Sequence, residues 1–418
     1  MDLHIGKPFF ITLACLFQSL LSLGLINGFS VMYAELISVF STSRLISAFI
    51  QGIFNFVALG AGLLWTWPIR HLGLGLSMSC GAVLSCVGFA ASSLARNSET
   101  IIFSTGLVSG IGLSIGYMAP FAVVGSLYKI DAGLPIALLT VAGSLGHMVL
   151  SQVYGGLLNY YHWSGTFIIL AGIALQGLPC GLFIHYSKEL LMNGEESEVK
   201  VKVHKRLNKD PVIWLYLTII VLIETTATFE IWFLVDQMTS RGYTKNFATS
   251  LLSVLGFANL VGRIIGIMVK MRKHSFPAVY YMFYVCPILA VGHALFILLQ
   301  TLHNWMYAAC TVYGVAFGLI NVFLPVIMYD LVDNDMFQQA VLQQNLALGT
   351  GTLISNFVGG SLRDSYGEYD IAYELGIVVS VLVTFGFIII VYVLRKRDKE
   401  RRCFITYDSQ CAQYKSFD

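Results

Sequence analysis

The sequence predicts an all-α integral membrane protein with twelve transmembrane helices arranged in two six-helix bundles. Three observations support this fold class. The chain has 418 residues, of which 56% are hydrophobic and only 11% are charged, whereas soluble domains carry about 25% charged residues. Its apolar runs are long and unbroken, as membrane-spanning helices require. One polar stretch divides these runs into six and six. A soluble enzyme, a nucleic-acid-binding protein and a secreted disulfide scaffold are therefore excluded.

Six apolar runs of about 20 residues or more precede the polar stretch, each long enough for one crossing. The first run is too long for a signal peptide, and no small-residue cleavage site follows it. Pro120 interrupts the fourth run, and we expect a kinked helix there rather than two spans. The predicted spans of the first half are residues 9–32, 45–67, 72–95, 101–127, 134–158 and 165–186.

The second half repeats the pattern, again with short connections between the apolar runs. Its predicted spans are residues 212–237, 247–269, 277–299, 305–328, 339–362 and 371–394. We therefore predict an N-terminal bundle over 1–187, a cytosolic linker loop over 188–211, a C-terminal bundle over 212–395 and a basic cytosolic tail over 396–418.

The distribution of basic residues predicts the orientation, because loops on the cytosolic side carry an excess of Lys and Arg. With the N-terminus inside, nineteen of the 25 basic residues fall on the inner side and five on the outer side. Only Arg263 falls within a span. Both termini are therefore expected in the cytosol, and we expect the plasma membrane as the location.

Two six-span halves joined by a charged loop are similar to the major facilitator plan, in which two bundles rock about a site near the bilayer midplane. The chain contains no nucleotide-binding loop that would indicate an ATP-driven pump, and no C-x-x-C spacing that would indicate a metal site. We therefore predict no cofactor and no metal.

Short motifs distributed in order along the chain resemble those of the monocarboxylate transporter family within that superfamily. The segments that carry the resemblance are 28–36 with 40–44, 80–93, Gly106, Gly110, Gly112, Tyr117, Pro120, Tyr128, 142–146, 234–236, 255–263, Tyr313, Gly314, Gly318, Pro325, 330–332 and 360–369. The chain departs from the family at Gly6-Lys7-Pro8, around 131–133 and near 357–358, so it is identified as a divergent member.

Arg263 is the leading candidate for substrate contact. It lies in an otherwise apolar span, where a charge costs at least roughly 2.5–3.5 kcal/mol near the bilayer centre. A guanidinium offers a planar two-pronged donor to a carboxylate. The alternative is that the side chain snorkels towards the end of the span near Lys270. The resemblance implies the first role, because the family's arginine in the eighth span is implicated in binding the substrate anion.

The resemblance also implies how transport is driven. A lysine in the first span and an aspartate in the eighth take part in proton coupling in the family, and the matching residues here are Asn27 and Asn259. Neither asparagine titrates. We therefore expect transport that is not obligatorily coupled to protons.

Three acidic residues lie in the seventh predicted span. We expect Glu230 to face the cavity and pair with Arg263 in the empty protein, and Glu224, nearer the cytosolic end, to lie at the membrane interface. Asp236 ends the span at the outer side, where it is a candidate for gating. His147 in the fifth span is expected to be a satisfied interior histidine.

The predicted function is a secondary transporter that moves a small carboxylate-bearing solute, either a monocarboxylate or an amino-acid-like molecule, by alternating access. Candidate polar lining residues besides those named are Tyr33, Tyr117 and Asn321, while Pro120 and Pro325 are candidate hinges. The alternatives are a proton symporter that uses Glu230, and a receptor or scaffold that moves nothing. The expected partners are a small organic anion or zwitterion, the lipid bilayer and, as in some relatives, a single-span ancillary membrane protein.

Overall fold

The computed structural model describes residues 3–40, 43–128, 133–191, 210–272, 276–332 and 334–415. Within these ranges the chain is helical and contains no strand. Most of the predicted linker loop 188–211, together with residues 131 and 132 of one departure from the family pattern, lies outside the described residues.

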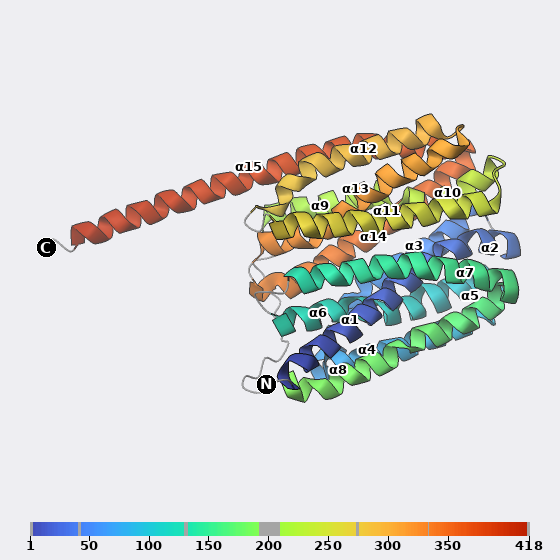
Figure 1. Cartoon of the computed structure of the whole chain (residues 1–418), viewed down its shortest axis with the longest axis horizontal. Helices are drawn as coiled ribbons and strands as arrows, with labels where there is room; N and C mark the ends of the chain where they lie inside the picture. The colour runs from blue at the N-terminus through green and yellow to red at the C-terminus, as the bar shows by residue number, and fades with distance from the viewer. Residues whose placement is uncertain are drawn as a thin grey trace.

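The first half of the chain forms helices that match its six apolar runs (Figure 1). In chain order they are α1 Leu3–Gly28, α2 Ser30–Phe40, α3 Arg44–Gly60, η1 Ala61–Trp65, α4 Thr66–Ser92, α5 Ser98–Ile101, η2 Ile102–Ser109, α6 Gly110–Tyr128, α7 Gly133–Leu175 and α8 Gly177–Leu191. Pro120 lies inside α6, which is one element, so the predicted single span is confirmed there.

The second half forms a comparable set of helices. They are α9 Pro211–Ala227, α10 Phe229–Ser240, α11 Lys245–Arg272, η5 Ala278–Tyr281, α12 Met282–Leu299, η6 His303–Trp305, α13 Met306–Leu331, α14 Asn334–Tyr366 and α15 Asp370–Lys415. The last helix runs well past the predicted end of the twelfth span at residue 394.

The helices account for twelve passes along one axis. Nine helical stretches of the described residues are long and apolar enough to cross a membrane. Two of these, Arg44–Ser92 and Gly133–Ser187, have 49 and 55 residues, or about 75–80 Å of helix, far more than a hydrocarbon core of roughly 30 Å. Each reverses at a break, near Gly73 (φ 81°) in one and at His162 (φ 54°) in the other, and so makes two passes. The remaining pass is α14.

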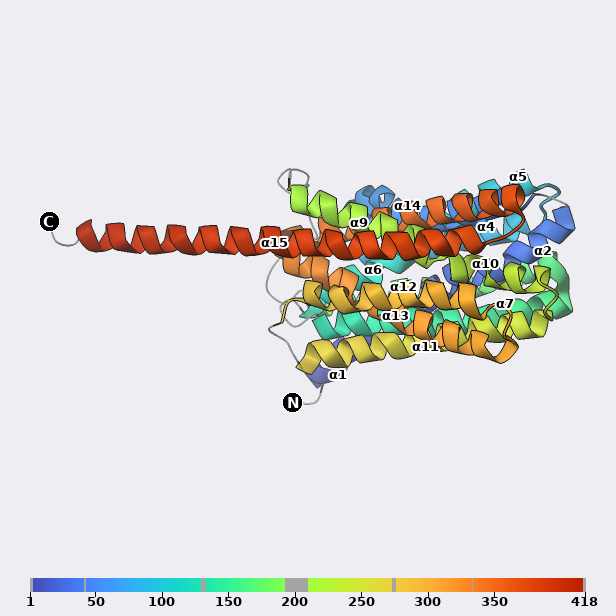
Figure 2. The same cartoon turned by 90° about the horizontal axis from the view of Figure 1, so that it is seen from above.

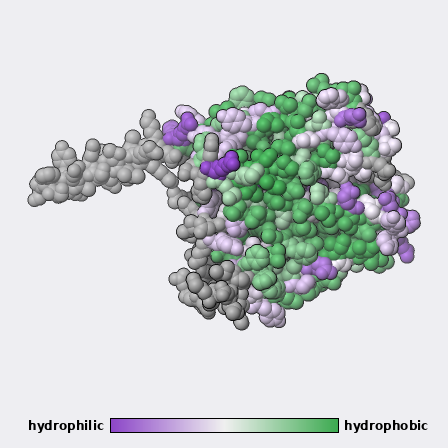
Figure 3. Space-filling view, viewed as in Figure 1, coloured by the Kyte–Doolittle hydropathy of each residue, from purple (hydrophilic) through white to green (hydrophobic). Residues whose placement is uncertain are grey.

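Both chain termini lie at the same end of the bundle (Figures 1 and 2), as an even number of passes requires. We call it the terminal end, and the opposite end, where α10 finishes and α7 turns back, the far end. In Figure 3 hydrophobic side chains cover the middle of the visible face, while hydrophilic ones gather towards both ends. This band is what a protein surrounded by lipid presents.

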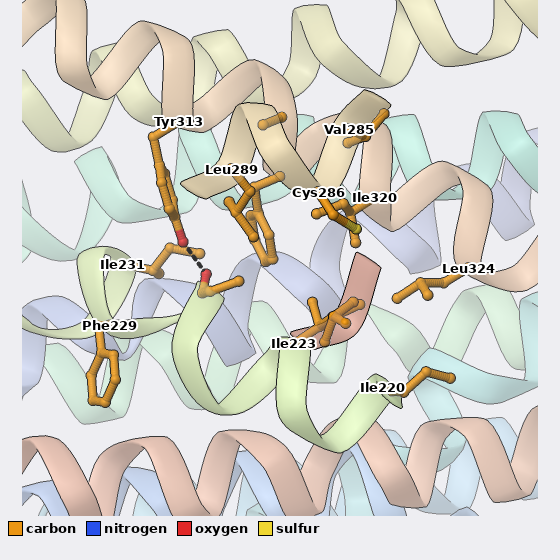
Figure 4. Close-up of a cluster of buried hydrophobic side chains, with 14 of the residues drawn as sticks. Ile220, Ile223, Phe229, Ile231, Val285, Cys286, Leu289, Tyr313, Ile320 and Leu324 are labelled. Atoms are coloured by element: carbon orange, nitrogen blue, oxygen red, sulfur yellow. Dashed lines mark hydrogen bonds between the residues drawn. The ribbon is translucent and has the colours of Figure 1, made fainter. Parts of the chain in front are cut away.

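Separate buried cores hold each half together. One large cluster is built almost entirely from residues of the second half, and two smaller clusters almost entirely from the first. Figure 4 shows part of the second-half core, where Tyr313 reaches the turn between α9 and α10. Close helix contacts depend on glycine: a Cβ on Gly146 would lie 2.0 Å from the Leu20 carbonyl oxygen of α1. The candidate site lies between the two halves, in a cavity lined by helices from both.

Candidate functional site

A polar cavity of about 110 Å³ lies between the two halves and is lined by helices from both. A cavity of this size has room for several water molecules or one small solute. Its wall combines apolar side chains with a set of polar ones, and this mixture is typical of small-molecule sites. The polar lining residues are Asn27, Asn55, Tyr117, Thr140, Ser144, His147, Glu224, Thr228, Asn259, Arg263, Asn321, Gln344, Asn345 and Thr352.

Arg263 is held at the contact between the two halves. Its Nε donates to Oδ1 of Asn259, one helical turn earlier on α11, at 3.0 Å, and its Nη1 donates to the backbone oxygen of Thr140 on α7 at 2.8 Å. Oδ1 of Asn259 also accepts from Ser144 at 3.1 Å. Nη2 of Arg263 makes no hydrogen bond to a described residue, which leaves one prong of the guanidinium available to a ligand. This geometry contradicts the snorkelling alternative.

Glu224 lies on the wall of the same cavity, with a side chain only 5% exposed. The expected interfacial position is wrong, because α9 begins at Pro211 and so places Glu224 thirteen residues, about 20 Å, into the bundle. Its Cβ lies close to the backbone of α14, because a Cβ added at Gly351 would come within 2.6 Å of it.

Glu230 does not make the expected contact with Arg263. Its Oε1 lies 2.7 Å from Nδ1 of His293 on α12, and both side chains are completely buried within the second half. The physical reason is helical periodicity. Glu230 follows Glu224 by six residues, about 240° around a helix, so it is turned away from the face on which Glu224, Thr228 and Trp232 line the cavity.

Polar contacts join the two halves at the far end, and we call them the far-end closure. Nε of Arg44 on α3 lies 3.1 Å from Oδ2 of Asp236 on α10, and the Tyr369 hydroxyl donates to the same oxygen at 2.8 Å. The Leu45 amide donates to Asp364 at 3.0 Å. Asp236 is therefore part of the junction between the two halves at this end.

Tyr33 belongs to the far-end closure rather than to the cavity lining. Its hydroxyl lies 3.4 Å from the Arg44 carbonyl oxygen, and its ring meets Phe233 edge to face. At the terminal end the halves meet through apolar side chains instead, where Ala137 packs with Ile267 and Val322. The far end of the cavity thus has an ion pair between the halves, and the terminal end has an apolar contact between them.

Of the other residues predicted from the sequence, some line the cavity and others do not. Asn27, Tyr117, Asn321 and Pro325 line the cavity, as do Asn259 and Arg263. Pro120 lies inside α6 and is absent from the lining. His147 is mostly buried and lines this cavity together with a second one, of about 320 Å³, between α7 and α11.

Sequence analysis missed several lining residues besides Glu224. Asn55 on α3 is fully buried, and neither of its side-chain polar atoms has a hydrogen-bond partner in the part of the chain that the structure describes. Oε1 of Gln344 on α14 is likewise buried without a partner there. Such groups cost free energy unless something hydrogen-bonds to them. The feature of the sequence that could have identified these two residues is an amide side chain within an apolar run.

Comparisons with known proteins agree with this architecture. The sequence profile of the Major Facilitator Superfamily matches residues 12–355. Monocarboxylate transporter 6 of Mus musculus is 22% identical over 399 residues, covering 90% of this chain and 85% of the relative. Monocarboxylate transporter 1 of Bos taurus is 25% identical over 419 residues, covering 90% and 83%.

Solved structures show the same fold. The proton:xylose symporter XylE, bound to 6-bromo-6-deoxy-D-glucose, superposes with a TM-score of 0.72 at 14% identity, covering 91% of this chain and 95% of the other. The inward open conformation of XylE from E. coli gives 0.72 at 14%, covering 90% and 95%. The predicted fold class and the resemblance to a divergent monocarboxylate transporter are confirmed. The chain belongs to the Major Facilitator Superfamily and is a multi-pass membrane transporter homologous to the monocarboxylate transporters, not an enzyme.

Proposed function

We propose that this protein moves a small carboxylate-bearing organic solute, a monocarboxylate or an amino-acid-like molecule, across the plasma membrane by alternating access. Both termini and the linker face the cytosol in this proposal, in accord with the distribution of basic residues. The relatives are named as monocarboxylate transporters, and this supports a monocarboxylate-like substrate.

The observation that carries the proposal is the geometry of Arg263. Its Nε and Nη1 are anchored to Asn259 and Thr140, so the guanidinium plane is fixed before a ligand arrives. Arg263 lines a cavity built by both halves, where its remaining amino group would bind the solute. A preorganised, permanently charged donor in a largely desolvated site favours a carboxylate.

Alternating access requires each end of the cavity to open in turn. The far-end closure depends on Asp236, and we assign it the role of the gate at that end. Pro325 lines the cavity within α13 and Pro120 lies within α6, where each removes a backbone hydrogen bond and permits bending.

We further propose that transport is not obligatorily coupled to protons. Asn27 and Asn259 occupy the positions at which the family's coupling residues are expected, and neither titrates. Glu230, the alternative proton carrier, is paired with His293 outside the cavity lining, so a substrate in the cavity does not touch it.

The decisive experiment is uptake of radiolabelled monocarboxylates and neutral amino acids into proteoliposomes. Arg263→Ala should reduce uptake about 10–100-fold, because a hydrogen bond to a charged group contributes roughly 1.5–3 kcal/mol. Arg263→Lys should also be impaired, since an ammonium lacks the planar fork. Arg96→Ala removes an equal charge from an exposed position and serves as the matched control.

Two results would contradict the proposal. Uptake by Arg263→Ala equal to that of Arg96→Ala would reduce Arg263 to a structural residue. Saturable solute binding without flux would indicate a receptor on the same fold. Coupling is tested with an imposed pH gradient at fixed membrane potential, where accumulation above equilibrium would show that the transporter is a proton symporter.

A further inference from the structure

We propose that Glu224 and Arg263 form a two-point site for a zwitterion, in which Arg263 binds the carboxylate of the solute and Glu224 binds its ammonium group. The inference rests on the proposed function and narrows its substrate class. It assigns a binding role to Glu224, which sequence analysis placed outside the site.

Arg263 and Glu224 line one cavity, but their charged groups do not form an ion pair with each other. Glu224 on α9 is 5% exposed and Arg263 on α11 is 9% exposed, and both line the same cavity. Among the described residues, no side-chain nitrogen of Lys, Arg or His lies within 4.0 Å of the Glu224 carboxylate. A carboxylate so deeply buried needs a cationic partner to stay ionised, and the ammonium group of a bound solute would supply it.

The charges on the cavity wall also bear on the choice of solute. With Glu224 ionised, Arg263 and Glu224 together are neutral, and the other polar lining residues are amides, hydroxyls and His147. A simple carboxylate bound to Arg263 would leave a net negative charge in a desolvated space, whereas a zwitterion would keep the site neutral. The site therefore favours the zwitterion over the anion of the same shape.

Apolar side chains also line the cavity that contains the two charges. Leu23, Trp232, Leu255 and Phe317 contribute apolar surface to the cavity, which suits a hydrocarbon body attached to two charged groups. Both amide atoms of Asn55 and Oε1 of Gln344 are buried without a hydrogen-bond partner among the described residues, and they can bind the remaining polar edges of the solute. Neutral amino acids of modest size have this chemistry.

The test compares matched molecules that differ by one charged group. L-valine is compared with 3-methylbutanoate, which lacks the ammonium, and with 2-methylpropan-1-amine, which lacks the carboxylate. L-phenylalanine is compared in the same way with 3-phenylpropanoate and 2-phenylethylamine. Binding is measured as thermal stabilisation of the purified full-length protein, and transport as uptake into proteoliposomes.

We expect at least one of the amino acids to bind about tenfold or more tightly than its carboxylate analogue. Glu224→Gln should abolish this preference while preserving binding of the analogue, and Glu224→Asp, which keeps the charge, should retain part of it. Glu374→Gln removes an exposed carboxylate on α15 and should change nothing. The comparison within the wild-type protein holds even where a variant folds poorly.

The outcomes separate this inference from the proposed function. Equal binding of amino acids and carboxylate analogues, or no response to any amino acid, overturns the zwitterion site. Loss of analogue binding in Arg263→Ala would still support the proposed function. Uptake of 3-methylbutanoate that is driven by an inward proton gradient and lost in Glu224→Gln would also overturn the inference, because Glu224 would then carry a proton.

Discussion

Replacing Arg44 with alanine should open the far end of the transporter more often. Arg44 on α3 is the charged member of the far-end closure contributed by the first half, and its Nε lies 3.1 Å from Oδ2 of Asp236. The contacts of Asp236 with Tyr369 and Arg363 lie within the second half. Arg44→Ala therefore removes the ion pair between the halves and leaves the second-half partners of Asp236 in place.

The expected magnitude follows from the exposure of the pair. The side chain of Asp236 is 11% exposed and that of Arg44 is 36% exposed. An exposed ion pair contributes roughly 0.2–1 kcal/mol, and a buried hydrogen bond to a charge roughly 1.5–3 kcal/mol. We expect about 1 kcal/mol for this pair, which corresponds to a roughly fivefold shift from the closed to the open population.

The assay is the accessibility of the cavity from the far side. A cysteine introduced at Asn27, on the cavity wall, is labelled with a membrane-impermeant maleimide added to the side that faces the far end. Arg44→Ala should raise the labelling rate about fivefold, after subtraction of the same protein without the new cysteine.

The matched control is Arg241→Ala. Arg241 also lies at the far end and pairs with Asp370 at 2.5 Å, but both residues belong to the second half. Breaking this pair should leave the labelling rate unchanged. Equal rates in Arg44→Ala and Arg241→Ala would refute the reasoning, because the ion pair across the halves would then not hold the closure.

Three further predictions test the framework. Glu230→Gln should lower the free energy of unfolding by about 1–3 kcal/mol, measured in detergent, because it replaces the carboxyl group that lies against buried His293 with an amide. Gly146→Ala should cost about 1–3 kcal/mol by forcing α1 and α7 apart, whereas Gly155→Ala, which meets nothing within 4 Å, should not destabilise. Epitope tags at the two chain ends should be reached by antibody only after permeabilisation, and surface labelling of one tag alone would contradict the even number of passes.

Much of the fold was predictable because membrane insertion imposes rules that act on short stretches of sequence. Every backbone polar group in lipid must be satisfied within its own helix, so apolar runs of sufficient length mark the spans directly. The cost of burying a charge likewise made Arg263 conspicuous in the sequence, and Arg263 lies in the cavity lining. Four other candidates named from the sequence also line the cavity, namely Asn27, Tyr117, Asn259 and Asn321.

The acidic residues required the tertiary structure. Helical periodicity predicts that Glu224 and Glu230, six residues apart, do not share a face. Which of the two faces the cavity depends on how α9 and α10 pack against the other helices, and that packing places Glu224 in the lining. The partner of Glu230 is His293, which lies on a helix 63 residues away along the chain.

Contacts between the two halves could not be predicted from the sequence either. Tyr33 was expected in the cavity, but it lies at the far-end closure because α2 carries it past the cavity towards Arg44. The sequence by itself determined the membrane environment, the number of passes and the buried charge, since each depends on local hydrophobicity. Only the tertiary structure decided which charges share a cavity and which close it, because those pairings depend on how separate helices pack.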